Sequence, residues 1–118
     1  MEIARAVLEA QVFQVRAMTD AFGAAGFSVS ELRADGGAAA MDSLICMQAT
    51  LSHTRVRRSS SLEATARGVA LAAGLGCGLW TSIDELESLW TSTFDALSTA
   101  ETSLETNYQS WITATSKA

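Results

Sequence analysis

The sequence predicts an α/β fold that is rich in helices and contains two strands or so. An apolar segment over residues 27–34 ends in Asp35-Gly36-Gly37, and an alanine-rich helical pattern follows at once. Three later segments place a Glu three residues after a Ser or Thr, which is typical of helix N-termini. Of the 118 residues, 48% are hydrophobic and 18% are charged, a balance typical of globular proteins. We find no linker-like segment and expect residues 1–118 to form one unit.

The first helix is predicted to run from about Ile3 to Ala24. Its charged residues lie on one narrow stripe at helical spacing, which we interpret as the face toward water: Glu2, Arg5, Glu9, Arg16 and Asp20. Apolar residues occupy most of the remaining surface. A helix with one wet stripe is covered on two sides, which indicates a helix embedded in a larger protein.

The next elements are a strand over residues 27–34 and a second helix over residues 38–51. Leu44, Met47 and Leu51 are the expected apolar contacts of that helix. Residues 54–58 form a short strand candidate with one strongly apolar residue, Val56. We therefore interpret this segment as an edge strand.

The remaining chain predicts three helices. Ser60 with Glu63 opens the first of them, Ser82 with Glu85 the second, and Thr102 with Glu105 a terminal helix. The first also carries small residues at intervals of four, which predicts close packing on the sheet beside the glycine turn: Ala64, Gly68, Ala72 and Gly76. Two strands leave sheet edges unpaired, so such a sheet needs a helix layer or a partner.

The Asp35-Gly36-Gly37 turn is the candidate binding site. Two glycines at a strand-to-helix turn let a flat ligand lie against bare backbone, because neither carries a Cβ. The helix that follows directs its free N–H groups and positive dipole end at the same space, which suits phosphate. Most turns of this kind merely connect elements.

Several classes of function are disfavoured. The net charge of −5 argues against nucleic acid as a partner, and we interpret the cluster Arg55, Arg57 and Arg58 as a solvated strand or loop. Two cysteines and one histidine make a four-ligand zinc site improbable. We interpret Cys46 and Cys77 as small buried groups in a reducing compartment.

No membrane segment or targeting signal is predicted. The longest apolar stretch, residues 68–80, is shorter than the roughly 20 residues that span a bilayer. The chain opens directly into an amphipathic helix. We therefore expect a soluble, cytoplasmic protein.

Other candidate residues have structural interpretations. The acids Asp84, Glu85 and Glu87 near a helix start are expected to interact with the helix dipole rather than to catalyse. The tryptophans at positions 80, 90 and 111 are expected as core anchors. His53 is interpreted as a loop histidine.

Five segments in order resemble the FGGY family of carbohydrate kinases. Residues 3–16 are similar to a helix of the family, and residues 32–40 to its strand and Asp-Gly-Gly turn. Residues 63–80 resemble a later alanine- and glycine-rich helix, and Asp84-Glu85-Leu86 the segment after it. The tail with Asn107, Tyr108 and Trp111 favours the glycerol kinase branch over the sugar kinases. The resemblance covers the C-terminal part of the family's second lobe.

This resemblance implies an actin-like, ribonuclease H-like α/β domain, of which the chain would supply the last strands and helices. The family transfers the γ-phosphoryl group of ATP, with Mg²⁺, to a sugar or polyol hydroxyl. Its phosphate loops, catalytic aspartate and glycerol contacts would all precede Met1, so no catalytic or metal-binding residue is expected here.

The family's adenosine site does have a counterpart. By resemblance, Gly36 and Gly37 face the nucleotide, and Gly37 is the better candidate for direct contact. Met41 stands where the family has an adenine-binding asparagine. A thioether is a poor acceptor and cannot donate, so polar recognition of adenine is weakened while stacking on sulfur remains.

Two further departures from the family occur at Arg67, in place of a leucine, and at Ser59, in place of a proline. An arginine buried there without a partner would cost several kcal/mol, so we expect it at a surface.

The sequence leads to one hypothesis and two alternatives. The first is a C-terminal fragment or truncated form of a glycerol kinase that supplies one wall of an ATP or ADP pocket and is inactive alone. Its expected partner is the missing N-terminal lobe. The second is a catalytically inactive, stand-alone interaction module that forms a dimer or binds another protein through the surfaces that this lobe would cover. The third is a sister sugar kinase of the same family.

Overall fold

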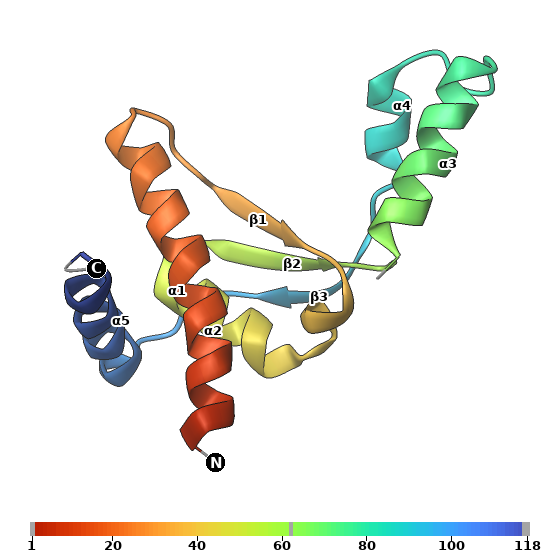
Figure 1. The fold of residues 1–118 in the computed structure, drawn as a ribbon. Coiled ribbons are helices and arrows are strands. Elements are labelled where there is room, and N and C mark those ends of the chain that lie inside the picture. The colour runs from red at the N-terminus through yellow and green to blue at the C-terminus, as the bar shows by residue number, and fades with distance from the viewer. Residues whose placement is uncertain (1, 62, 117–118) are drawn as a thin grey trace.

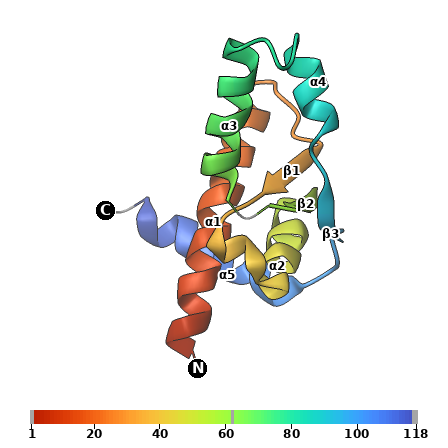
Figure 2. The same cartoon turned by 90° about the vertical axis from the view of Figure 1, so that its right-hand side faces the viewer.

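The computed structural model describes residues 2–61 and 63–116. Its body has three layers, formed by a pair of helices (α1 and α5), one central helix (α2) and a small sheet, and two further helices project from it as an arm (Figures 1 and 2). None of the helices described is long and apolar enough to cross a membrane.

The sheet has three strands in the order β1-β2-β3. β1 (Glu31–Ala34) runs parallel to β2 (Arg55–Ser59), and β3 (Ser92–Ala96) runs antiparallel to β2. Leu32, Val56 and Ala96 lie in register across it. The prediction of an edge strand at residues 54–58 is therefore wrong. β2 takes the central place, and its Val56, only 1% exposed, packs against Ile45 and Ala49 of α2.

The strand predicted over residues 27–34 is shorter than expected. β1 begins at Glu31, and Phe27 is 67% exposed. β3 was not predicted, because only Phe94 and Ala96 of its five residues face the core.

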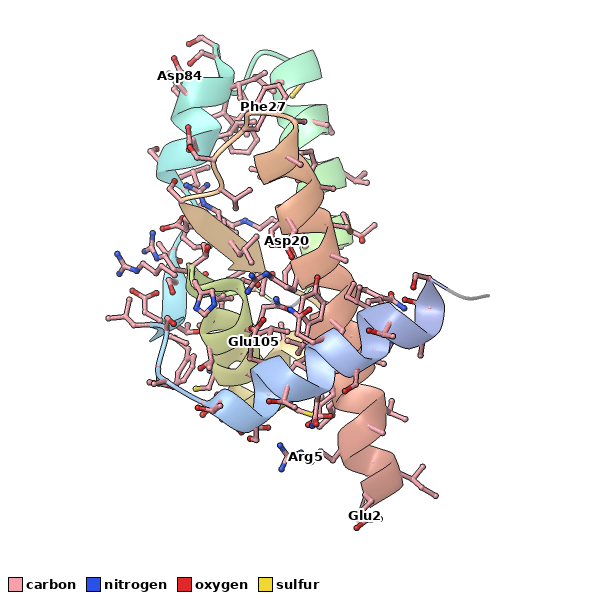
Figure 3. All side chains as sticks on the ribbon, turned by 90° about the vertical axis from the view of Figure 1, so that its left-hand side faces the viewer. Glu2, Arg5, Asp20, Phe27, Asp84 and Glu105 are labelled. Atoms are coloured by element: carbon pink, nitrogen blue, oxygen red, sulfur yellow. The ribbon has the colours of Figure 1, made fainter. Side chains whose placement is uncertain are left out.

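α1 (Glu2–Ala24) confirms the first predicted helix, but its polar stripe is only partly exposed to water. Glu2, Arg5 and Asp20 are exposed, whereas Glu9 and Arg16 are largely covered. α5 (Thr102–Thr115) lies across that stripe, and Figure 3 shows Asp20 and Glu105 near the crossing of the two helices. Glu9 is 7% exposed and accepts hydrogen bonds from Arg5 and Asn107. The stripe is charged because it pairs with polar groups of α5.

The second predicted helix divides in two. A 3₁₀ turn, η1 (Gly37–Ala40), comes first, Met41 is extended, and α2 (Asp42–Ser52) follows. α2 lies between two core clusters. On one side it joins α1 and α5, through Val12, Phe13, Leu44, Leu51, Leu104 and Tyr108. On the other it covers the sheet, through Ala39, Ile45, Ala49, Val56 and Ala96.

The arm consists of α3 (Ala64–Gly76) and α4 (Ile83–Ser88). It points away from the body in Figures 1 and 2. Within the described residues, α3 makes no extensive contact with the strands, and the small side of the helix at Gly68, Ala72 and Gly76 is exposed. The predicted packing of that side on the sheet is therefore wrong for this chain.

Only one of the three predicted capping pairs forms. The Ser82 hydroxyl accepts the Glu85 N–H at 3.3 Å, and the Glu85 carboxylate accepts the Thr81 N–H at 2.7 Å. Ser60 instead hydrogen-bonds to Thr91, and α3 starts at Ala64. α5 has Glu101 at its N-cap without a side-chain hydrogen bond. The helices α3 and α5 therefore begin without a side-chain cap.

The cysteines and tryptophans also depart from expectation. Cys46 and Cys77 are both exposed, not buried. Trp111 does pack on the α1–α5 cluster. Trp90, however, lies against the guanidinium groups of Arg33 and Arg57, at 4.5 and 4.7 Å from its ring centroid. The attraction between these cations and the indole ring stabilises its position on the sheet.

Candidate functional site

The glycine turn lies at the carboxyl end of β1. Gly36 has φ 84° and ψ 174°, a backbone region that is almost confined to glycine. Gly37 has an ordinary φ and is exposed, and a Cβ built there would meet nothing within 4 Å. The two glycines thus have different roles: Gly36 allows the turn, whereas Gly37 presents bare backbone to the space above it.

Met41 is the third predicted site residue. It precedes α2 as its N-cap, with φ −85° and ψ 110°, so it does not lie within a helix as the sequence suggested. Its N–H donates to the Ala38 carbonyl at 3.2 Å, and its carbonyl accepts from Leu44 and Ile45 at 3.1 and 3.3 Å. The side chain is 39% exposed. With its backbone engaged, Met41 offers a ligand its thioether.

Arg58, which the sequence analysis interpreted as part of a solvated cluster, contacts the turn from β2. From the central strand, it donates to the Ala39 and Ala40 carbonyls at 3.3 and 3.2 Å and to the Asp42 carboxylate at 2.6 Å. Its side chain is 17% exposed. The alternation along β2 could have separated it from Arg55 and Arg57, because Arg58 lies on the same side of the strand as buried Val56.

The other two arginines lie on the outer side of the sheet. Arg55 and Arg57 both bond Asp95, and Arg57 also approaches Glu31 at 3.6 Å. The hydrogen bonds from Ser92 and Arg55 lower the pKa of Asp95 to about 2. The predicted solvated cluster is therefore correct for Arg55, which is exposed, but not for Arg58.

Two hollows share Arg33 and Asp35 in their linings. One, of about 350 Å³, is formed by β1, η1, α2 and the α1 residues Gln11 and Val15. The other, of about 500 Å³, lies at the base of the arm and includes Arg67 and Gly68 of α3 together with Trp90. Asp35, the first residue of the turn, thus borders both a hollow beside α1 and a hollow at the arm.

Arg67 has a partner in the second hollow. It donates to the Leu89 carbonyl, at the end of α4. The expectation that it lies at a surface agrees with its partly exposed side chain. Arg67 therefore joins the two helices of the arm.

The other polar candidates have local roles. Hydrogen bonds from Thr81 hold the pKa of Glu85 below its usual value, as expected for an acid in the first turn of a helix. Glu87 approaches Arg33 at 3.4 Å. His53 ends α2 in the left-handed conformation, with φ 50°. Over residues 2–61 and 63–116, no group of three or more His, Cys, Asp or Glu side chains could hold a metal ion.

The chemistry of this site is that of binding. Bare backbone at Gly37, an exposed thioether at Met41 and the first N–H groups of α2 suit a flat group that carries polar or anionic substituents. Phosphoryl transfer also needs a site for the hydroxyl group that receives the phosphate and a carboxylate that accepts its proton. Both would have to come from other parts of a larger protein.

Comparison with known proteins gives the same family by sequence and by structure. The model of the "FGGY family of carbohydrate kinases, C-terminal domain" matches residues 1–77. Glycerol kinase 1 of Saccharolobus solfataricus is 43% identical over 89 residues, which cover 75% of this chain and 18% of the relative. Glycerol kinase of Methylibium petroleiphilum is 48% identical over 93 residues, covering 75% and 19%.

A solved structure covers almost the whole chain. The crystal structure of Plasmodium falciparum glycerol kinase with ADP superposes with a TM-score of 0.74 at 27% identity, over 96% of this chain and 23% of that one. The chain spans about a fifth of the length of the relatives that it matches.

Proposed function

This chain belongs to the FGGY family of carbohydrate kinases, within the family's C-terminal domain, and we propose that it is the C-terminal segment of a glycerol kinase. The parent protein would transfer a phosphoryl group from MgATP to glycerol. This segment would supply the wall of the pocket that binds the adenosine part of the nucleotide.

The fold supports this proposal, because it is that of a partial actin-like ATPase domain, with a small mixed sheet and many helices. One observation carries the proposal. Gly36 and Gly37 join β1 to the 3₁₀ helix η1, in a chain that superposes on a glycerol kinase solved with ADP. Gly37 is exposed there and has open space around it. A nucleotide could lie against that backbone without moving a side chain.

The residues present fit part of a nucleotide and not its metal. Gly37 and the Met41 thioether would contact the adenosine moiety, and Met41 would do so by dispersion rather than by a hydrogen bond to adenine. In the described part of the chain, acidic side chains do not gather in groups of three or more that could bind a metal ion, and several are paired with arginines, as Asp42 and Asp95 are. Mg²⁺, which holds the phosphates in such kinases, would be held by the parent's other residues.

The missing lobe is the proposed partner of this segment. α1 exposes an apolar face that the sequence predicted to be covered, with Ile3 83%, Val7 55%, Met18 59% and Phe22 50% exposed. Burial of such a face stabilises a protein by about 25 cal/mol per Å². In the parent protein, a lobe that precedes this segment would bury the α1 face and so stabilise the fold.

Titration of the isotope-labelled 118-residue chain with ADP tests the nucleotide site. We expect the amide resonances of Gly36 and Gly37 and the Met41 methyl resonance to move. Gly37→Ala should weaken binding, because its new methyl group occupies the ligand's space, yet it should leave the free energy of unfolding nearly unchanged, because φ is not positive and the space is open. Gly36→Ala is the contrast and should cost about 1–3 kcal/mol of stability through backbone strain.

A chimera tests the assignment to glycerol kinases. This chain replaces the matching portion of the Methylibium petroleiphilum enzyme, and glycerol-dependent ADP formation is measured. We expect activity in the chimera and none in the 118-residue chain alone. A folded chimera that phosphorylates another sugar or polyol but not glycerol would instead support a sister kinase, and activity of the isolated chain would contradict the proposal.

A stand-alone interaction module is the second candidate, and the exposed α1 face favours it. Such a module would associate through that face with another protein or a second copy. A chain that remains a compact monomer at high concentration by light scattering would argue against it. Cytoplasmic localisation belongs to both proposals.

A further inference from the structure

We propose that Arg58 is the positioning residue of the nucleotide turn: it ties the segment 39–42 to the central strand and so sets where Met41 meets a ligand. The inference rests on the nucleotide role proposed above. It concerns a residue that would not touch the nucleotide itself.

The Arg58 guanidinium forms hydrogen bonds with the segment on both sides of Met41. The Ala39 and Ala40 carbonyls, at 3.3 and 3.2 Å, precede Met41, and the Asp42 carboxylate, at 2.6 Å, follows it. All three contacts are made by one nitrogen, Nη1. Because Nη1 carries two hydrogens, two of the three acceptors share one hydrogen. Arg58 therefore restrains Met41 from both directions along the chain.

Packing holds the guanidinium itself in place. Its Cζ atom lies 4.9 Å from the centroid of the Phe94 ring, on β3. The side chain is 17% exposed, while Asp42 is 64% exposed. The fixed partner is thus the arginine, which leaves the central strand of the sheet, and the turn is the part that it holds.

Apart from the buried side chain of Ala39, the turn is restrained mainly by backbone hydrogen bonds. The 3₁₀ helix η1 has four residues, and the hydrogen bonds at its two ends are Ala39 N–H to Gly36 O, at 3.1 Å, and Met41 N–H to Ala38 O, at 3.2 Å. The carbonyls at a helix end need donors from elsewhere. Arg58 supplies them at Ala39 and Ala40, next to the residues that would face the ligand.

The Arg58→Lys variant of the 118-residue chain tests this role, with Arg57→Lys as the matched control on the same strand. A lysine side chain ends one bond before the position of Nη1 and has no planar group to pack on the Phe94 ring. Its ammonium group therefore cannot hold the three acceptors where Nη1 holds them. We expect Arg58→Lys to move the Met41 methyl and Gly37 amide resonances and to weaken ADP binding about tenfold, the range of lost charged hydrogen bonds. Arg57 bonds Asp95 on the other face, so its variant should do neither.

The outcomes separate the two proposals. If Arg58→Lys leaves the Met41 and Gly37 resonances where they are, the positioning role is overturned, whatever ADP does. If the unmodified chain gives no response to ADP while Arg58→Lys moves Met41, the nucleotide role fails and the restraint on the turn stands.

A second variant keeps the test open should Arg58→Lys unfold the chain. Asp42→Asn removes the charge from the exposed end of the same contact. It should move the Met41 methyl resonance and weaken ADP binding in the same direction. An unmoved Met41 resonance in folded Asp42→Asn would overturn the positioning role.

Discussion

Single residues of the α1–α5 contact form a polar network inside the molecule. Tyr108, 3% exposed, donates its hydroxyl to Asp20 at 3.0 Å. Arg16 bonds Asp20 and the Leu51 carbonyl, and its Cζ lies 5.6 Å from the Tyr108 ring centroid. Phe13 and Trp111 pack on the same cluster, at ring distances of 5.6 and 6.2 Å from Tyr108. This network orients α5 on α1 through polar contacts within an apolar cluster.

The Tyr108 hydroxyl should lose its proton at a higher pH in the folded chain than in the unfolded chain. Burial, and then the hydrogen bond to Asp20, raise the pKa of Tyr108 to about 12, above the usual value near 10. The folded state therefore retains this proton longer than the unfolded state. Its contribution to stability is complete below about pH 10 and is lost as the pH rises through about 12.

The measurement is direct because Tyr108 is the only tyrosine. Tyrosinate absorbance should show a midpoint near pH 12 in the folded chain and near pH 10 in denaturant. Asp20→Asn, which removes the charge of the acceptor, should lower the folded midpoint. A folded chain that titrates near pH 10 would contradict the buried contact.

Among the elements, the arm shows how one glycine fixes a local structure. A Cβ built on Gly74 would overlap the indole ring of Trp80, so that ring packs directly on the backbone of α3. Gly68, six residues earlier on the same helix, has open space around it. Trp80 thereby turns the chain back from α3 toward α4.

Gly74→Ala and Gly68→Ala should therefore have opposite effects. At Gly74 the methyl group displaces the Trp80 ring, and we expect a loss of about 1–3 kcal/mol together with a red-shifted tryptophan fluorescence. At Gly68 alanine only raises helix propensity, with a gain of up to about 1 kcal/mol. Thermal unfolding followed by circular dichroism measures both, and equal effects at the two sites would contradict the packing of Trp80.

The whole molecule is extended for its length. Its radius of gyration is 16.7 Å, whereas a compact domain of 118 residues would have roughly 13.5 Å. The difference arises because the arm projects from the body and α1 extends beyond the helix that crosses it (Figures 1 and 3). Surfaces that a compact domain would bury, such as the apolar face of α1, thus remain open.

Substitution of that face should separate stability from association. In the double variant Val7→Gln, Met18→Gln, both residues are more than half exposed, so the isolated chain should lose no more than about 0.5 kcal/mol. Leu104→Ala, at a residue 1% exposed, is the contrast and should cost about 2–5 kcal/mol. Urea unfolding gives both values.

Association is measured with the N-terminal part of the Methylibium petroleiphilum enzyme, expressed separately. The double variant should weaken its complex with that part. A double variant that unfolds as readily as Leu104→Ala would show that the face is already buried, by a second copy of the chain.

The local pattern was sufficient to predict most helices and the glycine turn. The 3.6-residue spacing fixes α1, the positive-φ requirement explains Gly36, and the Ser82–Glu85 cap forms within one turn. These features depend on residues close in sequence, which is why they could be predicted. β3 could not be predicted, because only two of its five residues contact the core and its neighbours define it as a strand. The central place of β2 could not be predicted either, because it depends on β3.

Only the tertiary structure decided what the charged and small residues do. By itself the sequence determined the α/β class and the family, and it predicted the three site residues at 36, 37 and 41. The structure decided that the polar stripe of α1 faces α5, that the small-residue side of α3 is open, and that Arg58 hydrogen-bonds the segment 39–42. Periodicity shows which residues share a face, but whether that face meets water or another element depends on chain segments far away in sequence.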